Sequence, residues 1–172
     1  SWNVQAYRLS LLILMAKIVV TGGLGFIGSE LVKYLFFDHD IYIFDKPRKE
    51  MINYFIDIPI KIIDRDNGVG HIYDLDPDII IHMGAKSSTD LASPDIAYNQ
   101  NTLLTNDLID YSLKKKKKLI YASSAATYGD GAKGFQDSDD FYDLRKLRPL
   151  NLYGWSKHNS DLYFTNHLLN GR

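Results

Sequence analysis

Short apolar runs alternate along the chain with longer stretches in which apolar residues recur at helical spacing. This alternation indicates βαβ units, and therefore a parallel sheet. The apolar runs are continuous, which is typical of strands that helices cover on both faces. Five strands are expected, over Lys17–Thr21, Ile41–Asp45, Ile60–Asp64, Ile79–Met83 and Leu119–Ser123.

Two long helices are expected in the second half of the chain. Before the first, Ser93 can cap the helix, and Pro94 suits its first turn. Apolar residues then recur on one face, at Ala97, Leu104, Leu108 and Tyr111. The second helix should run from about Tyr153 to Leu169, with Gly171 placed to end it.

Composition limits the classes of protein that fit. The chain has 172 residues, 45% of them apolar and 24% charged, which suits a single soluble globular domain. The net charge of −1 implies no nucleic-acid partner, and the five lysines Lys114–Lys118 are expected to be a solvated helix end. The absence of cysteine excludes a disulfide framework, a thiolate metal site and a cysteine nucleophile, and it fits the cytoplasm.

The first fourteen residues precede Met15, which we take as the natural start, so residues 1–14 are expected to be a non-native or upstream extension. The stretch Leu9–Val20 imitates a signal-peptide core. However, it has no small-residue cleavage site, and Lys17 interrupts it well short of the roughly 20 residues that span a bilayer. No membrane partner is therefore expected, with an export or membrane signal as the alternative.

The strongest local motif is a glycine-rich turn between the first strand and the following helix. Gly23, Gly25 and Gly28 fit G-x-G-x-x-G, and Gly22 begins an overlapping T-G-x-x-G-x-x-G. Such glycines permit a tight turn, close approach of a pyrophosphate and close packing of helix on strand. The helix start then presents amide groups to the phosphates. With its strand and helix in place, the motif predicts dinucleotide binding in a doubly wound parallel α/β sheet, or Rossmann fold, of strand order 3-2-1-4-5.

Acidic residues end the next two strands. A ribose-binding carboxylate is expected about 20 residues after the glycine motif. Asp45 lies close to that position. The basic residues Lys46, Arg48 and Lys49 follow it and would suit the extra phosphate of NADP, so the residues alone leave NAD and NADP open. Asp64 is placed either to meet the adenine edge or to serve as a turn residue.

A second group of candidate residues lies near the C-terminus. Tyr153 and Lys157 are four residues apart on the expected last helix and therefore share a face. An ammonium beside a phenol stabilises the phenolate, which makes it a usable base. Ser124, just after the fifth strand, can hydrogen-bond a substrate hydroxyl or carbonyl.

The glycine turn, the serine after the fifth strand and the Tyr/Lys helix follow one another along the chain in this order. With these motifs the chain from Met15 onward resembles the extended short-chain dehydrogenase/reductase family, and within it the heptose 6-epimerases that act on ADP-linked sugars. The glycine turn and Y-x-x-x-K are common to the whole superfamily. Narrower segments are GAKSST at Gly84–Thr89, YASSAATYGDG at Tyr121–Gly131, GFQD at Gly134–Asp137 and LRPLNLYGWSKH at Leu147–His158.

The resemblance implies a role for each candidate residue. Tyr153 would be the general base, Lys157 would assist it and bind the ribose, and Ser124 would polarise the substrate. Further cofactor contacts are implied at Phe26, Ile27, Asp45, Lys46, Met83, Gly84, Ala85, Lys86, Ser87 and Asn101. Lys86 departs from the small or neutral residue expected at its position.

The function that the resemblance implies is epimerisation at carbon six of an ADP-heptose, with NADP, or alternatively NAD, as cofactor. The chain has about half of the family's length, so the remaining strands and most of the sugar-nucleotide pocket are expected outside it, and the chain alone is expected to be inactive. A full-length homo-oligomer is also implied. The alternatives are another NAD(P)-dependent sugar-nucleotide epimerase or dehydratase, and a non-catalytic NAD(P)-binding module.

Overall fold

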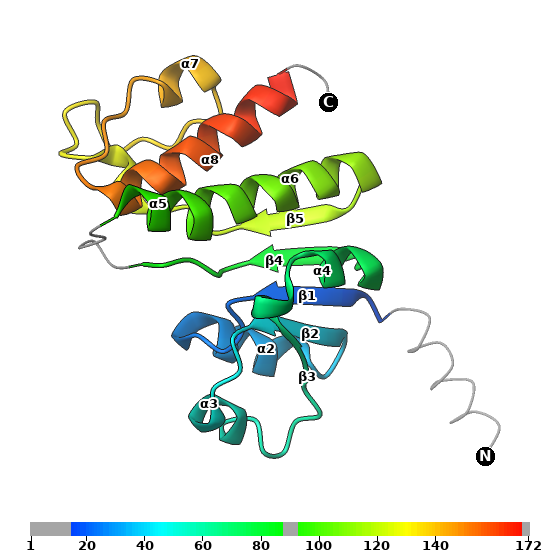
Figure 1. Ribbon diagram of the computed structural model, residues 1–172. Helices are drawn as coiled ribbons and strands as arrows, with labels where there is room; N and C mark the ends of the chain where they lie inside the picture. The colour runs from blue at the N-terminus through cyan, green and yellow to red at the C-terminus, as the bar shows by residue number, and fades with distance from the viewer. Residues whose placement is uncertain (1–14, 88–92, 170–172) are drawn as a thin grey trace. The chain divides into compact units, whose positions relative to one another are not determined.

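The computed structural model describes residues 15–87 and 93–169. The expected N-terminal extension, Ser88 and Thr89 of the GAKSST segment, and the helix stop at Gly171 lie outside these residues. The described chain divides into two compact units (Figure 1). The first unit comprises residues 15–84 and 117–120, and the second comprises residues 85–87, 93–116 and 121–169.

Five strands form one sheet in the order β3-β2-β1-β4-β5, as predicted. β1 pairs in parallel with β2 and with β4, and β2 pairs in parallel with β3. Each predicted strand is present, with ends that differ by at most two residues. Their bounds are β1 Lys17–Thr21, β2 Asp40–Asp45, β3 Lys61–Asp64, β4 Ile79–His82 and β5 Lys118–Tyr121.

The core of the first unit lies on both faces of β1. Successive residues of a strand point to opposite faces, and Ile18, Val19 and Val20 are all buried. On one face Ile18 and Val20 join a cluster that includes Val32 of helix α2. The helices of this unit are α2 Phe26–Leu35, α3 Lys49–Asn53, the short η1 Arg65–Asn67 and α4 Gly70–Leu75. The continuous apolar run of β1 therefore predicted its two-sided burial correctly.

The fifth strand lacks the two-sided burial of β1. β5 lies at the edge of the sheet, its Lys118 is exposed, and Ile120 is 47% exposed. An edge strand has one neighbouring strand, and alternate side chains of β5 point to a face that the described residues leave uncovered. The preceding lysines behave as expected of a solvated helix end, since Lys114, Lys115 and Lys116 are exposed.

The second unit is mainly helical. It contains α5 Pro94–Ala97, the π-helical turn η2 Tyr98–Leu103, α6 Leu104–Lys115, η3 Ala125–Tyr128, α7 Phe141–Leu144 and α8 Leu152–Leu169. Two expectations need correction. Ser93 occupies the cap position of α5 without a side-chain cap hydrogen bond, and the single expected helix is interrupted by η2.

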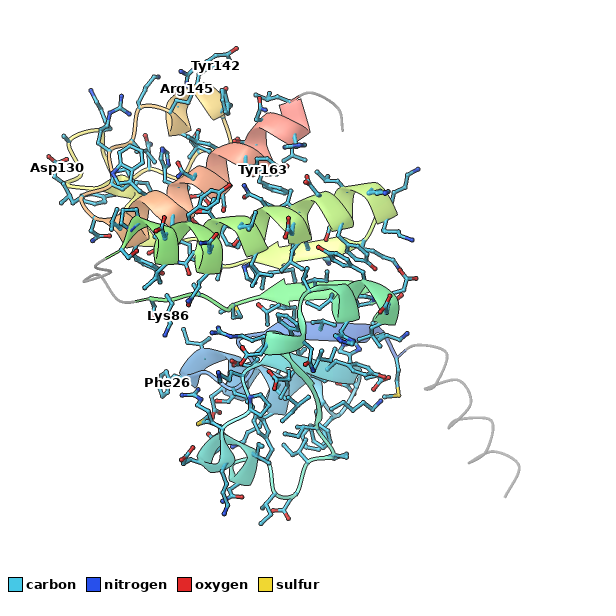
Figure 2. The ribbon with its side chains drawn as sticks, viewed as in Figure 1. Phe26, Lys86, Asp130, Tyr142, Arg145 and Tyr163 are labelled. Carbon is cyan, nitrogen blue, oxygen red and sulfur yellow. The ribbon has the colours of Figure 1, made fainter. Side chains whose placement is uncertain are left out.

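Helices α6 and α8 pack side by side (Figure 2), and polar side chains join them. Ser160 Oγ lies 3.0 Å from Asn106 Oδ1, and the Tyr163 hydroxyl lies 2.8 Å from Asp110 Oδ1. The buried residues of α8 include Ser156, Lys157, His158, Ser160 and Thr165. Within the described residues no helix is both long and apolar enough to cross a membrane.

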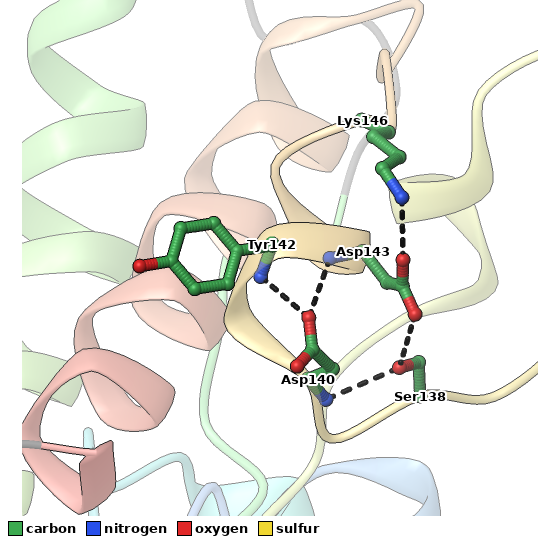
Figure 3. A network of polar contacts seen from close by, with 5 residues as sticks. All are labelled: Ser138, Asp140, Tyr142, Asp143 and Lys146. Carbon is green, nitrogen blue, oxygen red and sulfur yellow. Dashed lines mark hydrogen bonds and ion pairs between the residues drawn. The ribbon is translucent and has the colours of Figure 1, made fainter.

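The short helix α7 is fixed by a local polar network (Figure 3). Asp140 caps it by accepting hydrogen bonds from the backbone amides of Tyr142 and Asp143, at 2.8 and 2.9 Å. Lys146 binds the Asp143 carboxylate at 2.6 Å. A carboxylate cap satisfies amides that a helix start otherwise leaves unpaired, which explains how four residues form a stable turn.

Candidate functional site

The glycine turn between β1 and α2 has the geometry that phosphate binding requires. Gly22 has φ of +69°, a conformation that disfavours side chains. A Cβ on Gly28 would lie 2.2 Å from the Gly22 carbonyl oxygen, so the helix can approach the turn only with glycine there. The α2 start has no side-chain cap, so its amides depend on another partner. These residues fit a dinucleotide pyrophosphate, because an uncapped helix start offers N–H groups and a positive dipole end.

Asp45 holds the turn to the end of β2. Its carboxylate accepts a hydrogen bond from Leu24 N at 3.0 Å and a second from Lys46 N at 2.7 Å. Arg48 donates to the Leu24 carbonyl at 3.1 Å, so Leu24 is held through both of its backbone polar groups. The predicted ribose-binding carboxylate is therefore fixed against the predicted phosphate-binding turn.

The other charged residues at this edge have partners of their own. Lys46 forms an ion pair with Asp66 at 2.7 Å, and this hydrogen bond raises the pKa of the lysine. Asp64 accepts a hydrogen bond from Asp66 N at 3.0 Å and caps η1. Of the two roles considered for Asp64, the structure shows the turn role.

Phe26 and Ile27 lie at the start of α2 with their side chains exposed, 91% and 64% respectively. Figure 2 shows the Phe26 side chain at this end of the helix. Both flank the turn that the sequence predicted to hold the cofactor. Their side chains leave apolar surface next to the amides at the start of α2, which have no side-chain cap.

The ends of β1 and β4 are joined by a buried pair that sequence reasoning missed. Thr21 Oγ1 lies 2.5 Å from His82 Nδ1, and it also accepts a hydrogen bond from Gly84 N at 3.1 Å. Met83 N donates to the Thr21 carbonyl at 3.1 Å. The contact fixes Met83 and Gly84, two of the predicted cofactor contacts. Its partners are sixty-one positions apart in sequence, so no local pattern indicates it.

In the second unit, Asn101 fixes the backbone of Lys86. Its side-chain oxygen accepts from Lys86 N at 2.7 Å, and its amide nitrogen donates to the Lys86 carbonyl at 3.1 Å and to Ser156 Oγ at 3.0 Å. Asn101 is only 1% exposed, so it would affect a cofactor through the Ala85–Ser87 segment that it holds. The Lys86 side chain itself is exposed (Figure 2).

Lys157 is the most unusual group of the second unit. It is 3% exposed, and its ammonium donates to the Ala122 carbonyl at 2.8 Å and lies 4.8 Å from the centre of the Tyr121 ring. Burial lowers the pKa of Lys157 to about 8, while the Asp161 carboxylate opposes that shift. Tyr153, half-buried, precedes it by one turn of α8 on the same face.

Ser124 lies just beyond β5, as expected, and caps η3. Its Oγ accepts a hydrogen bond from Ala126 N at 3.2 Å. A hydroxyl that accepts one hydrogen bond retains its own proton to donate, so Ser124 can still polarise a carbonyl.

A second contact that sequence reasoning missed joins Ser123 to α8. Ser123 Oγ donates to Asp161 Oδ2 at 2.7 Å. Asp161 lies one turn beyond Lys157, and burial raises its pKa despite the opposing effects of Ser123 and Lys157. The spacing of Tyr153, Lys157 and Asp161 places them in one row along the helix, a signal that was available in the sequence.

These features define a Rossmann-type domain with the Y-x-x-x-K pair, and the chain belongs to the NAD dependent epimerase/dehydratase family, whose profile matches residues 18–168. Among curated proteins, it is 40% identical over 148 residues to an ADP-L-glycero-D-manno-heptose-6-epimerase of Fusobacterium nucleatum subsp. nucleatum. That match covers 81% of this chain and 45% of that protein. The chain thus spans about half the length of the curated relatives it matches.

Solved structures of similar proteins have the same fold. A Helicobacter pylori ADP-L-glycero-D-manno-heptose-6-epimerase superposes with a TM-score of 0.71 at 26% identity, covering 90% of this chain and 52% of that one. A UDP-N-acetylglucosamine 4-epimerase from Methanobrevibacter ruminantium M1 gives a TM-score of 0.74 at 26% identity, covering 89% and 50%. Both are sugar-nucleotide epimerases.

Proposed function

We propose that this chain is the cofactor-binding and proton-transferring part of a sugar-nucleotide epimerase that uses NADP and acts at carbon six of an ADP-linked heptose. The observation that carries the proposal is the buried Lys157 ammonium, one helical turn from Tyr153, in a chain whose glycine turn fits a dinucleotide. A buried ammonium is costly, and ionisable groups with strongly shifted pKa values cluster at functional sites.

Three residues of the second unit have separate roles in the proton transfer. Tyr153 takes the proton of the substrate hydroxyl and later returns it. Lys157 stabilises the tyrosine's charged form, since with a pKa of about 8 it remains mainly an ammonium at pH 7. Ser124 donates a hydrogen bond to the same substrate oxygen. A nicotinamide cofactor, when bound, would supply the hydride chemistry, with hydride leaving the substrate carbon and returning to its opposite face, so that no net oxidation would occur.

In the first unit, the amides at the start of α2 bind the pyrophosphate and Asp45 meets the ribose. Arg48 supports NADP over NAD. Its guanidinium donates to the Leu24 carbonyl, and the amide of the same Leu24 donates to Asp45, the carboxylate that would meet the ribose. The Lys46 charge, by contrast, is paired with Asp66. A guanidinium suits a phosphate monoester because it donates in a fixed fork.

ADP-heptose is favoured as the substrate by the 40% identity to the Fusobacterium nucleatum relative. A UDP-sugar is the second candidate, since the UDP-N-acetylglucosamine 4-epimerase gives the larger TM-score of the two structures compared. Both candidates use the same first step, abstraction of a hydroxyl proton with hydride transfer.

The test has a binding arm and a turnover arm. NADP and NAD are titrated against the 172-residue chain. Turnover of ADP-heptose and of UDP-, GDP- and dTDP-sugars is then measured after joining the chain to the second half of the Fusobacterium nucleatum relative. We expect dinucleotide binding and epimerisation of ADP-heptose. Binding without turnover of any sugar nucleotide would contradict the proposal and favour a non-catalytic NAD(P)-binding module.

A further inference from the structure

The Lys157 ammonium depends on a segment of chain that another residue holds in place. Its hydrogen-bond acceptor is the Ala122 carbonyl, in the short connection between β5 and η3. The next residue, Ser123, donates its side-chain hydroxyl to Asp161 on α8. Since Lys157 and Asp161 belong to the same helix, the connection is attached to α8 at two consecutive residues.

Asp161 is also the charged neighbour that opposes the lowering of the Lys157 pKa by burial. Two titratable groups interact with this ammonium, the Tyr121 ring and the Asp161 carboxylate. Tyr153 lies one turn before Lys157 on α8 and interacts with Tyr121. From η2, the contacts to the adjoining Ser156 are made by Asn101 and Thr102, which are neutral. Of the groups named, the carboxylate is the one that opposes the effect of burial on the pKa of Lys157.

We propose that Asp161 is a positioning residue for Lys157, which it serves in two ways. Through Ser123 it fixes the connection whose Ala122 carbonyl accepts the ammonium, and its negative charge favours the charged form of the lysine in a buried site. The inference rests on the proposed function, because Lys157 is the group proposed to support Tyr153. Asp161 itself need not touch substrate or cofactor.

The two contributions can be separated by substitution. Asp161→Asn removes the charge and retains an oxygen that accepts from Ser123, whereas Ser123→Ala removes the hydrogen bond and retains the charge. Asp110→Asn is the matched control, because Asp110 is also a carboxylate that accepts a hydroxyl hydrogen bond beside α8, from Tyr163. Asp161 raises the pKa of Lys157 against the effect of burial, whereas Asp110 is not among the groups that shift this pKa.

The pKa of Lys157 is measured by NMR titration of ε-¹³C-lysine in the 172-residue chain, with Lys157→Met identifying the signal. We expect Asp161→Asn to lower this pKa by about one pH unit. Ser123→Ala should lower it by less than half as much, and Asp110→Asn should leave it unchanged. Equal pKa values in the Asp161→Asn and Asp110→Asn variants would overturn the proposal, as would a Ser123→Ala effect as large as that of Asp161→Asn.

A measurement on the unaltered chain covers the case in which Asp161→Asn does not fold. As the pH falls through the titration of the Asp161 carboxyl, the Lys157 ε-carbon signal should show a second inflection, because a nearby charge is lost. A flat signal through that range would contradict the proposal. Neither measurement uses substrate or cofactor, so the role of Asp161 and the epimerase activity can fail independently.

Discussion

The Asp45 carboxylate at the end of β2 accepts a hydrogen bond at 3.0 Å from the backbone amide of Leu24, inside the glycine turn that follows β1. The two residues are twenty-one positions apart, and Leu24 is fully buried. A side chain predicted to bind a ribose thus also orders the turn predicted to bind the pyrophosphate.

Asp45→Ala should therefore reduce both stability and dinucleotide affinity. Loss of the acceptor leaves a backbone amide unpaired, and we expect the free energy of unfolding to fall by about 1–2 kcal/mol. Urea denaturation measures this effect, with Asp57→Ala, an exposed carboxylate of the same unit, as the control. A loss of stability no larger than that of the control would mean that Asp45 does not order the turn.

Two glycines of the first unit give a matched pair of substitutions. An added Cβ at Gly28 meets backbone 2.2 Å away, whereas at Gly70 nothing lies within 4 Å. Gly28→Ala should lower the free energy of unfolding by about 1–3 kcal/mol and weaken dinucleotide binding more than tenfold. Gly70→Ala should be neutral or slightly stabilising. Thermal melts measure the stability of both variants, and a dinucleotide titration measures their affinity. Equal stability and affinity of the two variants would mean that α2 does not approach the Gly22 carbonyl closely at Gly28.

NADP should bind to the chain at least as tightly as NAD, with Arg48 responsible for the difference. Arg48→Ala should weaken NADP binding about tenfold more than it weakens NAD binding, because both cofactors lose the support of the turn but only NADP carries the extra phosphate. Lys46→Ala, which removes a cation already paired with Asp66, should have a smaller effect. Nicotinamide or tryptophan fluorescence measures both affinities, and a tenfold preference of the unaltered chain for NAD would show the assignment to be wrong.

Lys157 should make stability depend on pH in the alkaline range. Its pKa falls from 10.5 to about 8 on folding, so between these values the unfolded chain binds more protons than the folded one. The cost of burying the ammonium is therefore fully present below about pH 8 and is relieved as the pH rises toward 10.5. Urea titrations at pH 7 and pH 9.5 should show that Lys157→Met gains stability relative to the unaltered chain mainly at pH 7. A gain independent of pH would contradict the depressed pKa.

Much of the fold could be predicted because its signals are local. Continuous apolar runs located the five strands, and the right-handedness of crossovers gave their order. The helix that carries Tyr153 and Lys157 was placed within one residue of its observed start, at Leu152. The i, i+4 spacing then put both side chains on one face without any knowledge of tertiary structure.

What the sequence did not predict depends on contacts between distant segments. Ser123 with Asp161, and Thr21 with His82, join residues thirty-eight and sixty-one positions apart, so no periodicity records them. The buried face of α8 is largely polar because its partners on α6 and η2 are polar too, and apolar spacing alone cannot reveal such a face. Ser93 was expected to cap a helix through its side chain, yet propensity gives only a tendency that the surrounding structure can override.

Tyr153→Phe tests whether Tyr153 transfers the proton in an epimerase, since the variant loses only a hydroxyl. The measurement is turnover of ADP-heptose at saturating NADP, with the chain joined to the second half of its Fusobacterium nucleatum relative and Tyr142→Phe, an exposed tyrosine of α7, as the control. We predict that turnover falls by about 10²- to 10⁴-fold in Tyr153→Phe, with NADP affinity and the control nearly unchanged. Turnover of Tyr153→Phe within a few-fold of the unaltered protein would mean that Tyr153 does not transfer the proton.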